Sequence, residues 1–103
     1  MDVTTLAGSG SSGSANGQGT AASFSNPYLL TADLSGNIIV AEYGNNKVRR
    51  IDPQGNVTTL AGSGSSGSAD GQGTSATFKN PQGVFSDHSG NVYVADTSNH
   101  NIR

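Results

Sequence analysis

The stretch Val57-Thr58-Thr59-Leu60-Ala61-Gly62-Ser63-Gly64 repeats Val3-Thr4-Thr5-Leu6-Ala7-Gly8-Ser9-Gly10 residue for residue. Residue 3 corresponds to residue 57, an offset of 54, and this offset holds without a gap to the end of the chain, where Arg103 corresponds to Arg49. An internal period of this size indicates a repetitive architecture, in which one unit cannot bury its apolar face alone and packs on its neighbours. The 103 residues are therefore two copies of one unit.

The composition excludes several classes of protein. Hydrophobic residues make up 32% of the chain and charged residues 12%, the formal net charge is −2, and there is no cysteine. Near-neutral charge offers no electrostatic attraction for nucleic acid or for an anionic membrane. No disulfide or thiol chemistry is available, and no apolar run approaches the roughly 20 residues of a membrane span. The one basic cluster, Lys47, Arg49 and Arg50, is expected to form a solvated strand face.

Short runs of β-branched and apolar residues, separated by Gly, Asn, Asp and Pro, predict four strands in each repeat. The expected strands are 28–32, 38–41, 47–51 and 57–61 in one copy, and 82–86, 92–95 and 101–103 in the other, with 3–7 as a further copy of 57–61. The runs 38–41 and 92–95 are the most apolar, which predicts burial on both faces. Turns are expected at 33–37, 52–56 and 87–91, where Asp provides an acceptor and Gly a positive φ. A four-stranded meander repeated at this period is one blade of a β-propeller.

Two polar segments, 8–23 and 62–77, contain mostly Gly and Ser and recur almost unchanged, with Asn16 replaced by Asp70. A loop shared by both repeats explains this recurrence better than a linker does. The run from Asp70 to Gly73 superficially suggests a calcium loop, but calcium needs about six oxygen ligands and only one acid is present. We therefore expect a turn without metal. Phe24 and Phe78 are expected to anchor these loops on the core, and Asn26 and Asn80, each before a proline, are expected to be extended.

The residues Asn80-Pro81-Gln82-Gly83-Val84, Gly90-Asn91-Val92-Tyr93-Val94-Ala95-Asp96 and Asn99-His100-Asn101-Ile102-Arg103 resemble the NHL repeat family. The first copy is similar over Asn26-Pro27, Gly36-Asn37, Val40-Ala41-Glu42 and Val48-Arg49, and the polar loops look like those of bacterial NHL repeats. Two departures are Leu29 at the position of Gly83, and Glu42 in place of the usual aspartate. The resemblance implies an all-β chain built of β-propeller blades of four antiparallel strands, within a ring that commonly has six blades.

Three segments follow from this pattern. Residues 8–61 form a first blade, residues 62–103 form a second blade that lacks its fourth strand, and residues 1–7 are a fourth strand that completes a blade of a neighbouring chain. Repeating this strand exchange predicts a homo-oligomer closed into a ring, because closure leaves no open sheet edge. Three chains give a six-bladed homotrimer, whereas two or four chains would give four or eight blades.

No residue is assigned a catalytic, cofactor-binding or metal-binding role. His88 and His100 lie in different turns, and the channel-lining strands 28–32 and 82–86 carry neither acid nor histidine. The acids Asp33, Asp87, Glu42 and Asp96 recur once per repeat, which favours a structural role.

The sequence therefore predicts a self-assembling structural fragment rather than an enzyme. This fragment is expected to be an excised or engineered pair of NHL repeats. Its expected partner is itself, without nucleic acid or membrane. The alternative is a binding module for a protein, peptide or glycan on one face of the ring. The candidate aromatic residues for that face are Tyr28, Tyr43 and Phe85, whereas Tyr93 is expected in the core.

Overall fold

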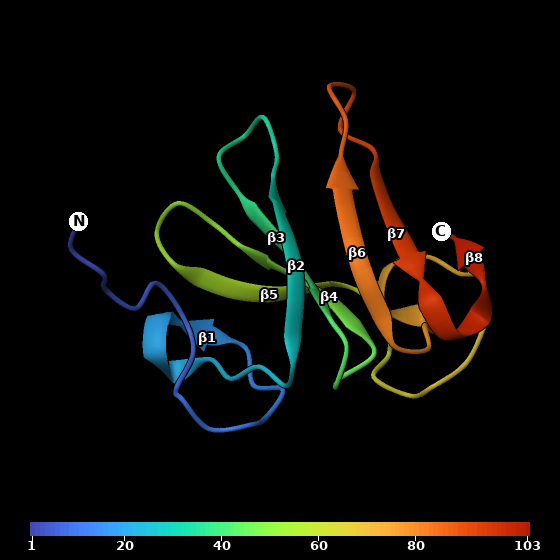
Figure 1. Ribbon diagram of the computed structural model, residues 1–103, viewed down its shortest axis with the longest axis horizontal. Helices are drawn as coiled ribbons and strands as arrows, with labels where there is room; N and C mark the ends of the chain where they lie inside the picture. The colour runs from blue at the N-terminus through green and yellow to red at the C-terminus, as the bar shows by residue number, and fades with distance from the viewer.

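The chain folds into two antiparallel β-sheets that pack against each other (Figure 1). The structure is a computed structural model that describes residues 1–103. In the first sheet the strand order is β1 (Gly17–Gln18), β5 (Asn56–Ala61), β4 (Lys47–Ile51), β3 (Ile38–Glu42) and β2 (Pro27–Ala32). The second sheet contains β6 (Pro81–Ser86), β7 (Val92–Asp96) and β8 (Asn101–Ile102). The predicted all-β class is confirmed, and the expected strands other than 3–7 are found within one residue of their bounds.

Helical structure is limited to three turns of 3₁₀ helix, each three residues long: η1 (Gly19–Ala21), η2 (Gly73–Ser75) and η3 (Thr97–Asn99). None of them has the length or the apolar character that crossing a membrane requires. The two-residue strand β1 lies within the polar segment 8–23, where no strand was expected. It pairs with β5, with Gly17 opposite Val57, and makes the first sheet five-stranded.

The hydrophobic core consists of two small clusters on opposite faces of the first sheet. Ala22, Val40, Ile51 and Val57 form one cluster between the sheet and its own polar loop, with Phe24 packed against it. Ile39, Val48, Phe78 and Val94 form the other cluster between the two sheets. Neighbouring residues of β3 thus point into different clusters, and the predicted burial on both faces is confirmed for 39–41. It is wrong for 92–95, where Val94 is buried but Tyr93 is 46% exposed. Both phenylalanines anchor their loops as expected.

Asn26 and Asn80 are not extended as the sequence suggested, because their φ values are +49° and +53°. In this conformation the carbonyl oxygen of Asn26 accepts a hydrogen bond from the amide of Tyr43 at 3.1 Å, and the Ser25 carbonyl accepts one from Gly44 at 3.0 Å. The backbone reversal therefore ties the start of β2 to the end of β3. Asparagine is one of the few residues other than glycine that tolerate a positive φ.

Residues 3–7 form no strand within this chain, and Figure 1 shows the N-terminal segment leading away from both sheets. Val3 is 83% exposed, whereas its counterpart Val57 is 1% exposed in β5. The same five residue types, Val-Thr-Thr-Leu-Ala, are therefore paired and partly buried in one copy and unpaired in the other.

Candidate functional site

Each repeat holds a charged cluster that fixes its polar loop to the sheet. In the first repeat Arg49 and Glu42 are both fully buried, with 3.0 Å between Nη1 of Arg49 and Oε1 of Glu42. Arg49 also donates to the carbonyl oxygens of Ala15 and Ser23, at 2.9 and 3.0 Å, and its guanidinium lies 5.1 Å from the ring centroid of Phe24. The prediction that Arg49 belongs to a solvated basic face is wrong. Burial of a guanidinium requires paired charges and hydrogen bonds, and the loop carbonyls and Glu42 provide them.

Glu42 is a shared acceptor within this cluster. Its Oε2 accepts hydrogen bonds from the backbone amide of Ser25 at 2.7 Å and from Nδ2 of Asn45 at 2.6 Å. Asn45 also donates to the carbonyl oxygen of Gly13 in the polar loop. The carboxylate therefore joins the sheet, the loop and the β3–β4 turn, which agrees with the expected structural role of this recurring acid.

The second repeat builds the same cluster from Arg103, Asp96 and Asn99, but it is less covered. Arg103 donates to Asp96 Oδ2 at 2.9 Å and to the Ala69 carbonyl at 3.0 Å. Its other carboxylate partner is Asp70, at 2.8 Å, whose side chain is 96% exposed. Asp70 therefore forms an ion pair between the loop and the sheet. In the first repeat the corresponding residue, Asn16, accepts a hydrogen bond from Nη2 of Arg49 through its Oδ1 atom at 2.9 Å. Asp70 and Gly71 themselves have no regular structure, and the chain turns only after them, in η2 (Gly73–Ser75).

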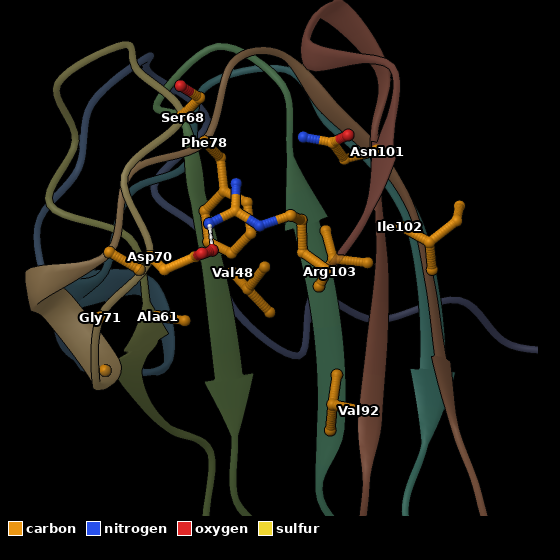
Figure 2. Close-up of a pocket in the computed structure, with 13 residues that line it drawn as sticks. Val48, Ala61, Ser68, Asp70, Gly71, Phe78, Val92, Asn101, Ile102 and Arg103 are labelled. Carbon is orange, nitrogen blue, oxygen red and sulfur yellow. Dashed lines mark hydrogen bonds and ion pairs between the residues drawn. The ribbon is translucent and has the colours of Figure 1, made fainter.

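The second sheet ends in an unpaired edge at β8, and a cavity of about 580 Å³ lies beside it. Figure 2 shows the side chains around this edge cavity, with the Asp70–Arg103 ion pair close to Phe78 and Val48. The edge cavity is lined by Val48, Ala61, Ser68, Asp70, Gly71, Gly73, Ala76, Phe78, Val92, Val94, Asn101, Ile102 and Arg103.

In the first repeat, β5 occupies the position that corresponds to the edge cavity. Val57 packs on Ala22 and Val40, whose counterparts Ala76 and Val94 line the cavity. The Thr59 hydroxyl donates a hydrogen bond to Asn16 Oδ1 at 3.3 Å, and the amide of Gly19 donates one to the Gly55 carbonyl oxygen at 2.9 Å. The counterparts of Asn16 and Gly19, which are Asp70 and Gly73, also line the cavity. The edge cavity is therefore lined by the counterparts of residues that, in the first repeat, hold the fourth strand β5 in place.

The three hairpin turns share one hydrogen-bonding pattern. In the turn 33–37, Asp33 Oδ1 accepts from the amides of Ser35 and Asn37, and Oδ2 accepts from the Asn37 side chain at 3.0 Å. Asp52 and Asp87 make the same bonds in the turns 52–56 and 87–91. These bonds favour the carboxylate. The Asn37, Asn56 and Asn91 side chains, followed by backbone amides, therefore lower the pKa of Asp33, Asp52 and Asp87 from the usual value of an aspartate.

Comparison with known proteins agrees with the repeat motifs. The sequence profile of the NHL repeat matches residues 78–103. The chain is 37% identical over an alignment of 95 residues to NHL repeat-containing protein 2 from both chicken and human, and the match covers 88% of this chain. The chain belongs to the NHL repeat family. It spans only 13% of the length of these two relatives.

Solved structures of β-propeller type contain the same arrangement as this NHL chain. A protein of unknown function from Bacteroides thetaiotaomicron superposes with a TM-score of 0.84 and 26% identity, over 89% of this chain and 24% of that one. An auxiliary nutrient binding protein from Bacteroides ovatus superposes with a TM-score of 0.79 and 27% identity, over 89% and 25%.

The remaining residues singled out in the sequence are distributed over the two NHL repeats. His88 and His100 lie at opposite ends of β7, and no three His, Cys, Asp or Glu side chains gather in a metal-binding group. Tyr28 and Tyr43 come together, with 6.3 Å between their ring centroids. The expectation that Tyr93 lies in the core is wrong for the single chain, because it is 46% exposed on a face of the second sheet that no other element covers.

Proposed function

We propose that this NHL chain assembles with copies of itself by strand exchange. Residues 3–7 of one copy occupy the edge cavity of another copy and complete its second blade. The observation that carries the proposal is the correspondence between this cavity and the site of β5. Its lining repeats the residues that hold β5, and residues 3–7 repeat residues 57–61 of that strand.

The register of the exchanged strand follows from the pairing of β4 with β5. Val48 faces Ala61 and Arg49 faces Thr59 in the first sheet, so Ile102 of one copy faces Ala7 of the next and Arg103 faces Thr5. Val3 then takes the position of Val57 above Ala76 and Val94. The Thr5 hydroxyl reaches Asp70, as the Thr59 hydroxyl reaches Asn16.

Burial of Val3 stabilises the complex by about 1.5–3 kcal/mol, and that of Leu6 by a similar amount. Association costs about 4–15 kcal/mol in lost freedom. A single exchanged strand therefore offsets only part of this cost, and a stable complex needs further contact between the copies.

The proposed assembly is a closed ring of three chains with six blades, each of four antiparallel strands. Two chains would form four blades and four chains would form eight. We also propose that the assembly has no catalytic activity. In support, β2 and β6, the strands expected to line the channel of the ring, carry no acid or histidine. The recurring acids accept hydrogen bonds in the turns and from the arginine residues.

The test is native mass spectrometry and light scattering of the chain and of two variants in the same segment. Val3→Asp places a carboxylate in the apolar part of the cavity and is expected to raise the dissociation constant at least about 100-fold. Thr4→Asp is the matched control, because its counterpart Thr58 is exposed in β5, and it should change the constant less than about tenfold. A folded monomer of the unmodified chain, or equal effects of the two substitutions, would overturn the proposal.

A second candidate is ligand binding on one face of the ring. Tyr28 and Tyr43 line a shallow pocket of about 470 Å³ together with Asn26, Pro27 and Gln82. Aromatic rings beside side-chain amides provide stacking and hydrogen bonds for a protein, peptide or glycan, and two similar structures are of auxiliary nutrient binding proteins. Screening glycan and peptide arrays with the chain and with Tyr28→Ala/Tyr43→Ala tests this function. Signals that are equal for both proteins, or no signals, would argue against it.

A further inference from the structure

The two sheets of one chain pack through residues whose counterparts in the other repeat lie on faces that no other sheet covers. Ile39 and Val48 of the first sheet pack against Phe78 and Val94 of the second sheet, and all four are buried. Figure 1 shows β2 and β6 side by side at this junction. We call the side of each sheet that meets the other sheet its inner face, and the opposite side its outer face.

The outer face of the second sheet is apolar and uncovered. Phe85 and Tyr93 are opposite each other across β6 and β7, and Ile102 pairs with Ala95. By the 54-residue offset, Tyr93 and Ile102 correspond to Ile39 and Val48. The latter two are 1% exposed each, whereas Tyr93 is 46% and Ile102 is 74% exposed. The positions that form the junction within the chain are therefore exposed in the second repeat.

The outer face of the first sheet carries the other half of the same pattern. Leu30 is opposite Val40 across β2 and β3 and is largely exposed, while Phe24 and Ile38 beside it are partly buried. Their counterparts Val84, Phe78 and Val92 all belong to the junction within the chain. Each outer face therefore matches, position by position, one of the two inner faces that already pack together.

We propose that the outer face of the second sheet of one copy packs on the outer face of the first sheet of the next copy. This inference rests on the strand exchange proposed above and identifies the second contact that the exchange requires. The two surfaces differ, so the contact is heterologous: it joins unlike faces and is repeated around a ring, whereas an isologous contact would join like faces. The central contact joins Tyr93 of one copy and Leu30 of the next.

Both contacts are satisfied by the same two copies. Within one chain Ala61 ends β5 and Gly62 begins the loop that precedes β6, so the fourth strand of one sheet leads directly to the sheet that packs on it. Ala7 and Gly8 make the same connection from residues 3–7 to the loop that precedes β2. The copy that donates the strand is therefore also the copy whose first sheet covers Tyr93.

The residues at the junction between copies are larger than those at the junction within the chain. At corresponding positions, the proposed junction between copies has Tyr93, Leu30 and Phe85 where the junction within the chain has Ile39, Val84 and Thr31. The exception is Gly83, which corresponds to Leu29. Aromatic side chains dominate the energetics of protein interfaces, because they bury a large area at a low cost in conformational entropy. The exposed Tyr93 and Phe85 thus have the character of interface anchors.

Cysteine cross-linking tests the inference, since the chain has no cysteine of its own. The double variant Leu30→Cys/Tyr93→Cys is treated with a short bismaleimide, and the two single variants serve as matched controls. A heterologous ring gives covalent species that extend to the full ring and stop there, at three chains for a trimer. Each single variant alone gives no covalent dimer, because its cysteines lie on faces that do not meet their own copies.

Cross-linked dimers from either single variant would indicate a two-fold contact and overturn the inference. The inference would also be overturned if the double variant forms an oligomer in native mass spectrometry but gives no covalent cross-link between copies. A folded but monomeric unmodified chain would instead overturn the strand exchange itself, so the two failures are distinguishable. If Tyr93→Cys disrupts folding in circular dichroism, Ile102→Cys replaces it on the same face, with the same expected and contrary results.

Discussion

Arg49 and Glu42 form an ion pair of 3.0 Å in which both side chains are fully buried, although the chain has only 12 acidic and basic residues in all. The pair is placed where the polar loop of the first repeat crosses the sheet, and the second repeat has the same pair in Arg103 and Asp96. The loops are rich in Gly and Ser and bring little apolar surface to the core. Their order therefore depends on hydrogen bonds from one guanidinium per repeat.

Replacing Arg49 by methionine is expected to destabilise the chain by about 3–5 kcal/mol. The substitution leaves the Glu42 carboxylate buried without its cation and leaves the Ala15 and Ser23 carbonyls without their donor. The unfolding free energy from urea titration, followed by circular dichroism, measures the effect.

Arg50→Met is the matched control, because Arg50 is the adjacent residue of β4 and is exposed. It should change the unfolding free energy by less than about 0.5 kcal/mol. A cost below about 1 kcal/mol for Arg49→Met would mean that the polar loop keeps its position without the arginine.

The sequence is sufficient to predict β2 to β8, and it is insufficient for the contacts between distant segments. The offset of 54 residues and the β-branched runs locate β2 to β8, because turn residues and apolar patterns act locally. The local sequence predicts an exposed Arg49 because the partners of Arg49 are remote: Ala15 lies 34 residues away. The local sequence does not predict β1 for the same reason, since only pairing with β5 makes Gly17 and Gln18 a strand.

The candidate site was predictable in part. The identity of residues 3–7 with 57–61 indicated a strand in need of a partner, but a sequence does not show that the counterparts of the β5 contacts line a cavity. The apolar run 92–95, which corresponds to the run that contains Ile39, predicts a buried Tyr93. Whether that face is covered depends on what packs on the second sheet, and this depends on tertiary and quaternary contacts rather than on local pattern.

The three aspartate turns predict loss of stability in acid. Hydrogen bonds from Asn37, Asn56 and Asn91 lower the pKa of Asp33, Asp52 and Asp87 in the folded chain. A lowered folded pKa contributes stability above the unfolded pKa of about 3.9, and this contribution is lost as the pH falls through the folded value. The midpoint of urea unfolding should therefore decrease between pH 5 and pH 3.

The triple variant with asparagine at positions 33, 52 and 87 should show a smaller decrease over the same range, because asparagine does not titrate. Asp2→Asn, an exposed position without a hydrogen bond in the chain, serves as a control and should keep the decrease of the unmodified protein. An equally steep decrease in the triple variant would assign the acid sensitivity to other carboxylates.

The positive φ of Asn26 predicts an unusual order of tolerance at this position. Asn26→Ala should destabilise the chain by about 1–2 kcal/mol, because the side chain of alanine is strained in the left-handed region. Asn26→Gly should cost less, since glycine adopts this conformation freely. Thermal unfolding of the two variants measures the difference, and an alanine variant as stable as the glycine variant would contradict the strained conformation.

Gly62 and Gly10 separate backbone strain from steric clash. Their φ values, +95° and +89°, are nearly equal, so alanine suffers similar strain at both positions. A Cβ atom at Gly62 would lie 2.6 Å from the Asn46 carbonyl oxygen, whereas at Gly10 nothing lies within 4 Å. Gly62→Ala must displace the backbone that joins the first sheet to the second polar loop. It should therefore lower the melting temperature more than Gly10→Ala, and equal losses would show that strain alone determines the cost at both glycines.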